Sequence, residues 1–112
     1  MNMTVKNLTE KLNLKIINCA DDERLIKNGF CGDLLSWVMG RAKQDDVWVT
    51  IITNINIIAV ATLADVSLII IADNAFLSDE VINLAKEKEI NLCSSNLSQF
   101  ELCGLIHRLI KS

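Results

Sequence analysis

One stretch, residues 47–72, most constrains what this chain can fold into. It reads VWVTIITNINIIAVATLADVSLIIIA, and its first 18 residues carry no charged side chain. A β-branched, strand-like run comes first, a helix-like apolar run follows, and a second strand-like run, residues 66–72, ends the stretch. This order predicts a β-α-β unit, and the continuous apolar character of the second strand is typical of a parallel sheet covered on both faces. Three polar residues follow the first strand and are called the polar notch below: Thr53, Asn54 and Asn56.

A membrane span is the alternative for this stretch, because 18 uncharged residues reach the usual minimum length. The polar notch lies near the middle of that run, where its amide groups would be costly in lipid. We therefore interpret the stretch as part of a folded core. The N-terminal sequence MNMTVKNLTEKL is polar and lacks a signal-peptide pattern. This predicts a cytoplasmic protein whose four cysteines are reduced and mostly packed as small hydrophobic residues.

Length and composition limit the number of domains and the kinds of partner that the chain can have. A chain of 112 residues predicts one domain, residues 1–112, with a core of its own. Its hydrophobic fraction of 51% and mean hydropathy of +0.33 are high for a small monomer, so we expect self-association, as in a homodimer. The net charge of −3 provides no basic field, which excludes nucleic acid and anionic membrane surfaces as partners.

The remaining elements follow from capping residues and hydrophobic periodicity. The expected strands span residues 14–18, 24–30, 47–53, 66–72 and 90–93, the second of them weak and with Asn28-Gly29 as a turn. Five helices are expected, capped in turn by Thr4, by Asp33, by Asn54 or Asn56, by Ser78, and by a box of Ser98 with Glu101. The alternation of strands and helices predicts a three-layer α/β fold with a mostly parallel sheet and helices on both faces.

Candidate ligand residues follow from this topology, because open parallel sheets bind ligands beyond the carboxyl ends of their strands. The polar notch follows the first strand of the unit, Asp73 and Asn74 follow the second, and a third polar run follows the next strand. That run comprises Ser94, Ser95 and Asn96. The same residue types also cap helices and form turns, so a ligand site and purely structural caps remain alternative interpretations.

A second candidate site is the segment NGFCGD, in which a glycine turn leads into a helix. The free N–H groups of a helix N-terminus attract anions, which makes Asn28 and Gly29 candidate ligand residues. Asp33 supplies a competing negative charge there, so a turn with an N-cap is the alternative.

Known catalytic patterns are missing from the sequence. It contains neither GxxxxGK[ST] nor GxGxxG, so neither a P-loop nor a dinucleotide fingerprint is present. His107, the single histidine, and Cys31 have no evident catalytic partner, and the cysteines lack metal-site spacing. The sequence thus predicts no metal and no cofactor. Trp37 and Trp48 are interpreted as core anchors.

The sequence also resembles a known family. The segment ERLIKNGFCGDLLSWVM resembles a degenerate DRTGG motif, with Glu23 in place of the Asp, Lys27 in place of the Thr and Asn28 in place of the first Gly. The residues that match are Arg24, Gly29, Asp33, Leu34, Leu35 and Ser36. Thr53 and Asn56 match a T-H-x-N segment of the same family, in which Asn54 here replaces the His. The C-terminal third, from residue 77 onward, resembles both this family and the N-terminal domain of HPr kinase/phosphorylase.

The resemblance implies a stand-alone regulatory domain without the separate P-loop kinase domain. It implies an HPr kinase N-terminal-domain-like α/β fold, often dimeric, that senses a nucleotide or another small phosphorylated metabolite. Seven residues are the candidate ligand contacts: Asn28, Gly29, Thr53, Asn54, Asn56, Ser94 and Ser95. One alternative is a protein-interaction domain that uses the apolar helix 57–64. The other is a phosphotransfer enzyme, for which Asp33 and Asp73 are the only acids near the strand ends.

Overall fold

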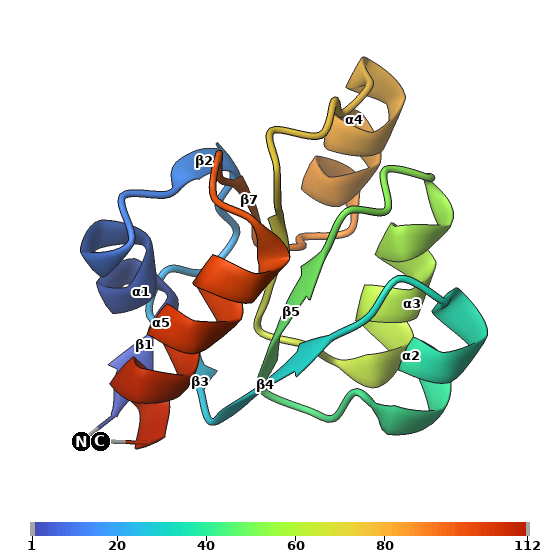
Figure 1. Ribbon diagram of the computed structural model, residues 1–112. Coiled ribbons are helices and arrows are strands. Elements are labelled where there is room, and N and C mark those ends of the chain that lie inside the picture. The colour runs from blue at the N-terminus through green and yellow to red at the C-terminus, as the bar shows by residue number, and fades with distance from the viewer. Residues whose placement is uncertain (1, 112) are drawn as a thin grey trace.

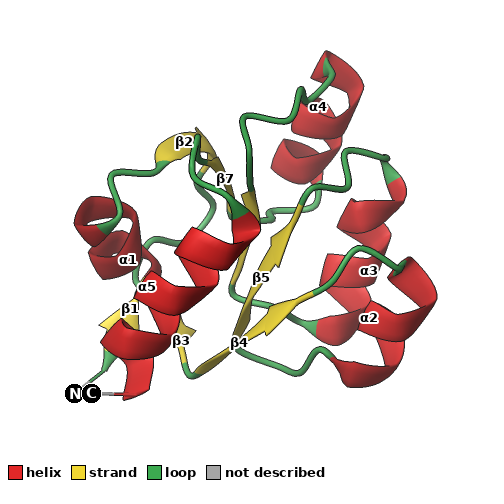
Figure 2. Cartoon of the chain, viewed as in Figure 1, coloured by secondary structure: helices red, strands yellow, loops and turns green. Residues whose placement is uncertain are grey.

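The computed structural model describes residues 2–111, which form a central sheet between two layers of helices (Figures 1 and 2). The strands are β1 (Met3–Thr4), β2 (Lys15–Asn18), β3 (Leu25–Ile26), β4 (Asn28–Cys31), β5 (Asp46–Thr50), β6 (Leu68–Ile71) and β7 (Leu92–Ser94). The helices are α1 (Val5–Lys11), α2 (Leu35–Arg41), α3 (Asn56–Ala64), α4 (Asp79–Glu87) and α5 (Gln99–Lys111).

Five of the strands form one sheet in the order β2-β7-β6-β5-β4. Strands β4 to β7 are parallel, whereas β2 pairs antiparallel with β7 at one edge. Strands β1 and β3 form a separate two-stranded pair. The parallel β5-α3-β6 unit confirms the β-α-β prediction for residues 47–72. The carboxyl ends of β4 to β7 therefore meet at one edge of the sheet, at the top of Figure 1.

Alternating side chains of the buried strands build two cores. Val47, Val49 and Cys93 point toward α1 and α5, whereas Trp48 and Ile69 point toward α2, α3 and α4. Every residue of β5 and β6 is buried, as expected for parallel strands covered on both faces. Figure 2 shows α5 in front of the sheet and α2 and α3 on its other side. The three-layer α/β architecture expected from the sequence is confirmed.

Helix α3 has an apolar sequence because one side of it is buried within the chain. Ile57, Ile58, Val60 and Ala61 are at most 6% exposed, because they pack against the sheet and the neighbouring helices. The outer side of the helix includes Ala59, Thr62 and Leu63, and Leu63 is 72% exposed. The helix therefore owes its apolar composition to intramolecular packing, and little of residues 57–64 remains for a partner.

Two local predictions near β4 are wrong. Asn28 and Gly29 do not form a turn, because both lie within β4, paired with Asp46 and Val47 of β5. Asp33 does not cap α2, whose N-cap position is Leu34 and has no side-chain hydrogen bond. The Asp33 carboxylate instead turns toward β5. Tertiary hydrogen bonds have replaced the local ones that the sequence pattern favours.

The two tryptophans occupy different environments. Trp48 is completely buried, and its Nε1–H donates to the carbonyl oxygen of Gly32 at 3.0 Å. Trp37 is 51% exposed, and the Arg41 guanidinium lies 3.5 Å above its ring centroid. The prediction of a core anchor is thus confirmed for Trp48 and wrong for Trp37, since α2 lies at the outer side of the layer.

The remaining caps largely follow the sequence. The Thr4 hydroxyl accepts from Asn7, the Ser78 hydroxyl accepts from Val81, and Ser98 forms its box with Glu101. For α3, the N-cap position is Ile55, while Asn54 Oδ1 accepts the N–H of Asn56 at 2.8 Å. Within residues 2–111, six non-glycine residues take positive φ, all of them in turns: Asn13, Asp45, Asp65, Asp73, Asn74 and Glu89.

Candidate functional site

The carboxyl edge of the sheet is organised by the side chain of Asp33. Its Oδ1 accepts from the Thr50 hydroxyl at 2.7 Å and from the backbone N–H of Ile51 at 3.0 Å. Gln99 Nε2, from the first turn of α5, lies 3.1 Å from both carboxylate oxygens. One carboxylate thus joins the end of β4, the end of β5 and the start of α5.

These hydrogen-bond donors favour the ionised form of Asp33. Burial alone raises the pKa of this carboxyl, but the hydrogen bonds from Ile51, Thr50 and Gln99 outweigh it and lower the pKa below its ordinary value of 3.8. Asp33 is therefore a carboxylate at neutral pH. A phosphate beside it would meet electrostatic repulsion, whereas a hydroxyl or an amine could donate to it.

The polar notch lies at this same edge, and the structure uses part of it for local folding. Asn54 accepts the N–H of Asn56 in the turn that opens α3, and both side chains are exposed. Thr53 is half-buried. Asn54 therefore forms a turn, as the structural alternative predicts. The exposed amides of Asn54 and Asn56 still face solvent.

Ser94 and Ser95 also lie at the carboxyl edge, but they are 8% and 9% exposed. Ser95 Oγ accepts the N–H of Leu97, and the Ser95 N–H donates to the Ile71 carbonyl at 2.9 Å. These contacts hold the turn between β7 and α5 against β6. The two serines thus stabilise the turn at the carboxyl edge, and their side chains project little into solvent.

Asn28 and Gly29 lie elsewhere, at the amino end of β4. The structure therefore does not gather the seven predicted residues in one place: five lie at the carboxyl edge and two lie at the other end of the sheet. Asn28 and Gly29 border a cavity of about 200 Å³ between β4 and α5, which we call the β4–α5 groove. Its lining consists of Asn28, Gly29, Phe30, Cys31, Val47, Val49, Cys103, Ile106, His107, Ile110 and Lys111.

The groove follows the edge strand β4, and α5 forms its outer wall. A Cβ atom placed on Gly29 would lie 3.4 Å from Val47 Cγ1 and 3.9 Å from Ile106 Cγ2. Gly29 therefore faces α5, and its missing side chain keeps the groove open. Cys31 and Cys103 mark one end of the groove, and Lys111 lies near the opposite end of α5.

Sequence reasoning missed most of this groove. Its lining combines β4 with α5, which are separated by most of the chain, and no short motif links them. The 3.6-residue spacing of Cys103, Ile106 and Ile110 marks one face of a helix, but the sequence does not say which strand that face covers. Gln99 and Thr50 were missed for the same reason, since Asp33 was taken as a local cap.

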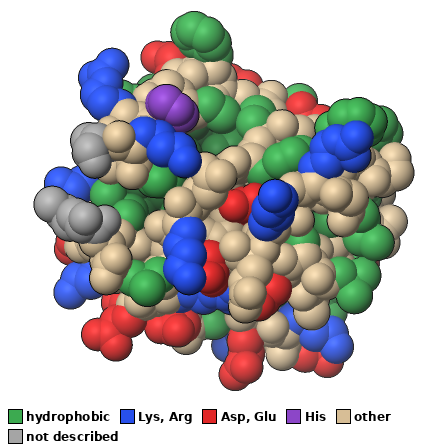
Figure 3. Space-filling view, turned by 90° about the horizontal axis from the view of Figure 1, so that it is seen from below, with side chains coloured by type: hydrophobic (Ala, Val, Ile, Leu, Met, Phe, Trp, Pro, Cys, Tyr) green, Lys and Arg blue, Asp and Glu red, His purple; other side chains and the backbone are tan. Residues whose placement is uncertain are grey.

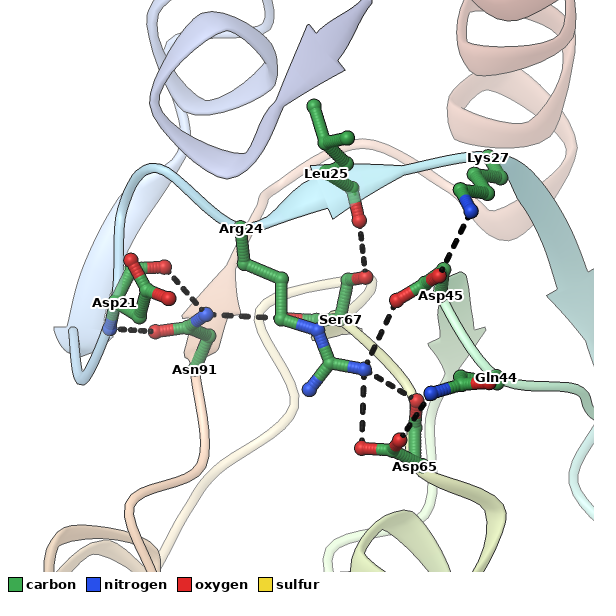
Figure 4. Close-up of polar contacts among 9 residues, drawn as sticks. All are labelled: Asp21, Arg24, Leu25, Lys27, Gln44, Asp45, Asp65, Ser67 and Asn91. Carbon is green, nitrogen blue, oxygen red and sulfur yellow. Dashed lines mark hydrogen bonds and ion pairs between the residues drawn. The ribbon is translucent and has the colours of Figure 1, made fainter.

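The opposite, amino end of the sheet carries a dense polar network (Figure 4). Arg24 Nη2 donates to Asp45 Oδ1 at 3.1 Å, to Asp65 Oδ1 at 3.0 Å and to the Asp65 carbonyl at 2.7 Å. Gln44 also donates to Asp65, and Lys27 pairs with Asp45 at 3.5 Å. The face in Figure 3 accordingly shows basic and acidic side chains next to one another, so their charges largely compensate.

Asn91 extends this network toward the loop between β2 and β3. It is 6% exposed, and its amide makes four hydrogen bonds. Its Oδ1 accepts from the N–H groups of Ala20 and Asp21, and its Nδ2 donates to the carbonyls of Asp21 and Ser67. The Ser67 hydroxyl in turn donates to the Leu25 carbonyl. These contacts tie the loop to β6 and β7.

Three residues of the segment that resembles the DRTGG motif have structural roles. Arg24 joins three segments at the amino end of the sheet, Gly29 leaves room for α5, and Asp33 joins three segments at the carboxyl end. Each role depends on the residue type that matches the DRTGG pattern. These three matched residues therefore have structural roles, and they do not by themselves define a ligand site.

Large hydrophobic side chains stand exposed around the carboxyl edge. Leu34, Ile51, Phe76 and Phe100 follow the ends of β4, β5, β6 and β7 respectively, and each is between 43% and 89% exposed. Among residues 2–111, no group of three or more His, Cys, Asp or Glu side chains is placed to hold a metal ion. None of the helices in that range has the length and apolar composition needed to cross a membrane.

These observations define a mixed α/β domain whose mostly parallel sheet is flanked by helices. No protein-family model matches the sequence, and no curated protein matches it. Among solved structures, the chain is similar to the CBS and DRTGG domains of the regulatory region of Clostridium perfringens pyrophosphatase, complexed with the activator diadenosine tetraphosphate. The TM-score is 0.73 and the sequence identity is 20%, and the match covers 92% of this chain and 45% of the other.

At this identity the likeness shows the fold, and this chain spans less than half of the similar one. The DRTGG-like fold expected from the sequence is thereby supported. The likeness to the N-terminal domain of HPr kinase/phosphorylase stays a prediction.

Proposed function

We propose that residues 1–112 form a non-catalytic regulatory domain that senses a nucleotide or another small phosphorylated metabolite. The observation that carries this proposal is the β4–α5 groove, a mostly apolar cavity with a lysine near one end. Support also comes from the structural likeness, because that regulatory region is complexed with a dinucleotide activator.

The size of the groove limits what enters it. Its volume of about 200 Å³ is smaller than the roughly 300 to 1,000 Å³ of pockets that enclose drug-sized ligands. The groove would therefore admit a single planar ring, such as a nucleotide base, and the rest of the ligand would remain outside. The apolar lining favours a ring over a free phosphate.

Charge favours the groove over the carboxyl edge for a phosphorylated ligand. Lys111 and His107 line the groove and are exposed, so Lys111 offers a cation to phosphate outside it. The carboxyl edge instead presents the ionised Asp33. Of the seven residues predicted from the sequence, Asn28 and Gly29 are thus the proposed contacts, and the polar notch is the alternative location.

Thermal unfolding in the presence of candidate ligands tests this proposal. The panel is ATP, diadenosine tetraphosphate, AMP, adenosine, acetyl phosphate and inorganic phosphate. A ligand at 100 times its Kd stabilises the folded state by about 2.7 kcal/mol, which raises Tm by roughly 10 °C for a domain of this size. We expect such a shift with nucleotides and a much smaller one with inorganic phosphate. No shift with any compound would remove the small-ligand proposal.

Paired variants locate the site. Gly29→Val places two methyl groups in the groove and should abolish the shift, whereas Gly40→Val should retain it, because nothing lies within 4 Å of a Cβ at Gly40. Lys111→Gln should weaken the binding of phosphorylated ligands but not of adenosine. If Asn56→Ala abolishes the shift and Gly29→Val does not, the ligand binds at the polar notch.

The second candidate function is a protein-interaction domain, and the exposed hydrophobic residues at the carboxyl edge favour it. They follow four neighbouring strands of the sheet, β4 to β7, and an exposed apolar surface often marks an interface. A second copy of the chain covering this surface would agree with the expected homodimer. The original candidate, helix 57–64, is disfavoured because Ile57, Ile58, Val60 and Ala61 are buried within the chain.

Mass measurement by light scattering tests this candidate. A dimer that becomes a monomer in the double variant Phe76→Ser/Phe100→Ser, with an unchanged circular dichroism spectrum, would support it. A monomer at all accessible concentrations would exclude self-association through this surface. Leu63→Ser is the matched control, since Leu63 is also highly exposed, at 72%, but lies near the end of α3.

A further inference from the structure

The β4–α5 groove contains two thiols that come from distant parts of the chain. Cys31 is the last residue of β4, and Cys103 lies in the second turn of α5. Gly29 faces α5, and Cys31 shares that face because strand side chains alternate. Cys103 lies three residues before Ile106, the residue opposite Gly29, so it belongs to the same face of the helix. Both thiols therefore meet at one end of the groove.

Their surroundings give the two thiols different chemistry. Cys31 is exposed, and Gln99 Nε2 donates toward its Sγ at 3.6 Å. Cys103 is half-buried, and burial followed by hydrogen bonding to Cys31 raises the pKa of its thiol to about 12. Cys31 is thus the thiol that a dissolved oxidant reaches, and Cys103 is the neighbour held beside it.

We propose that Cys31 and Cys103 are a modification site at which a peroxide forms an intramolecular disulfide. The Cys31 thiolate attacks one peroxide oxygen, the O–O bond breaks, and the products are a sulfenic acid at Cys31 and hydroxide. The Cys103 sulfur then attacks the Cys31 sulfur, the S–OH bond breaks, and the departing hydroxide takes up the Cys103 proton. Two thiols and one hydrogen peroxide yield one disulfide and two waters.

The disulfide would link the edge strand to the helix that covers it. It closes a chain loop that contains most of the sheet, so it should restrict the unfolded chain and raise Tm by several degrees. It also fixes the distance between the two walls of the groove at one end. The inference concerns the thiols themselves and does not rest on ligand binding.

A second pair of thiols in the molecule serves as an internal comparison. Cys19 and Cys93 border another cavity, next to α1. Cys93 is only 2% exposed, and burial raises the pKa of its thiol to about 12. Burial and the nearby Asp22 and Asp21 also raise the pKa of the Cys19 thiol, which keeps it protonated. The acidic neighbours of Cys19 therefore slow its oxidation, and the burial of Cys93 keeps a dissolved oxidant away from it.

Mass spectrometry of the full chain tests the proposal. The protein is treated with hydrogen peroxide, its free thiols are alkylated, and it is digested without reduction. We expect a linked peptide pair containing residues 31 and 103, with a loss of two hydrogens, while Cys19 and Cys93 stay alkylatable. Cys103→Ser should leave Cys31 to proceed to sulfinic acid, and Cys19→Ser should leave the linked pair unchanged.

Three outcomes would overturn it: sulfinic acid at Cys31 of the unaltered chain with Cys103 still alkylatable, a disulfide between Cys19 and Cys93 instead, or disulfides only between chains. Because the unaltered chain gives the deciding result, the test does not depend on whether the variants fold.

Discussion

The amide nitrogen of Gln99 lies 3.1 Å from both carboxylate oxygens of Asp33, across 66 residues of sequence. This contact joins the start of α5 to the end of β4, the two elements that form the walls of the groove. Asp33 also accepts a hydrogen bond from the Thr50 hydroxyl, so the same carboxylate connects α5 to the end of β5. The groove is consequently held by specific hydrogen bonds as well as by apolar packing.

We expect Asp33→Ala to lower the free energy of unfolding by about 2 kcal/mol, because three donors lose a charged acceptor. Leu34→Ala changes the neighbouring residue, which is 64% exposed, and should cost less than about 0.5 kcal/mol. Urea unfolding at pH 7 measures both. Equal stabilities of the two variants would contradict the role of Asp33.

The pH dependence of stability should also reveal Asp33. Hydrogen bonds lower the pKa of its carboxyl in the folded state below 3.8, so the unfolded chain binds the proton more tightly. Its contribution is present above that ordinary value and is lost as the pH falls through the lower folded pKa. We expect the stability gap between the unaltered chain and Asp33→Asn to be constant from pH 7 to 5 and to narrow below pH 4.

Arg24→Met should cost about 2 kcal/mol, because the side chain joins β3 to both Asp45 and Asp65 and is only 27% exposed. Lys27→Met is the matched control. Its side chain is 69% exposed and its ammonium pairs with Asp45 at 3.5 Å, which predicts a change below about 0.5 kcal/mol. Thermal unfolding of the two variants checks the difference, and similar Tm values would contradict it.

Asn91→Asp should be among the most destabilising single-atom changes in the chain, at about 3 kcal/mol. The new oxygen would face the Asp21 and Ser67 carbonyls in place of a donor, and the N–H groups of Ala20 and Asp21 alone would have to stabilise a buried negative charge. Asn96→Asp, on an exposed residue of the loop after β7, should change stability little. Chemical denaturation at pH 7 distinguishes the pair, and raising the pH should not rescue Asn91→Asp.

Trp48→Phe and Trp37→Phe should differ strongly despite identical chemistry. The first removes a buried hydrogen bond to Gly32 and leaves a cavity, at a cost of about 2 kcal/mol. The second loses part of a cation–π contact with Arg41, worth about 0.5 kcal/mol at an exposed position. Denaturant midpoints with unchanged m-values would confirm the comparison.

Most strands and helices could be predicted because periodicity and capping are local features of the sequence. Periodicity in residues 47–72 identified β5, α3 and β6, and capping residues such as Thr4, Ser78 and Ser98 marked helix starts. The errors occurred where a distant partner outweighs the local pattern. Asp33 has the composition of an N-cap, but a hydroxyl and an amide from other elements compete successfully for its carboxylate.

The candidate site was less predictable than the fold. Topology placed Thr53, Ser94 and Ser95 correctly at the carboxyl edge, since parallel strands all end there. It could not show that the serines are buried in a turn. Asn28 and Gly29 were predicted to form a turn, yet they line a groove because α5 packs over β4. Hydrophobic faces determine that packing, and the sequence of a hydrophobic face does not identify the element that it contacts.

The antiparallel pairing of β2 with β7 has a consequence for the order of folding during synthesis. Strand β2 leaves the ribosome well before β7, and at about 5 to 20 residues per second it waits several seconds for its only neighbour in the five-stranded sheet. During that time Ile16 and Ile17 present an unpaired edge, and Lys15 is the only charge within the strand that opposes mispairing. The nascent chain therefore stays open to mispairing at β2 until β7 has emerged.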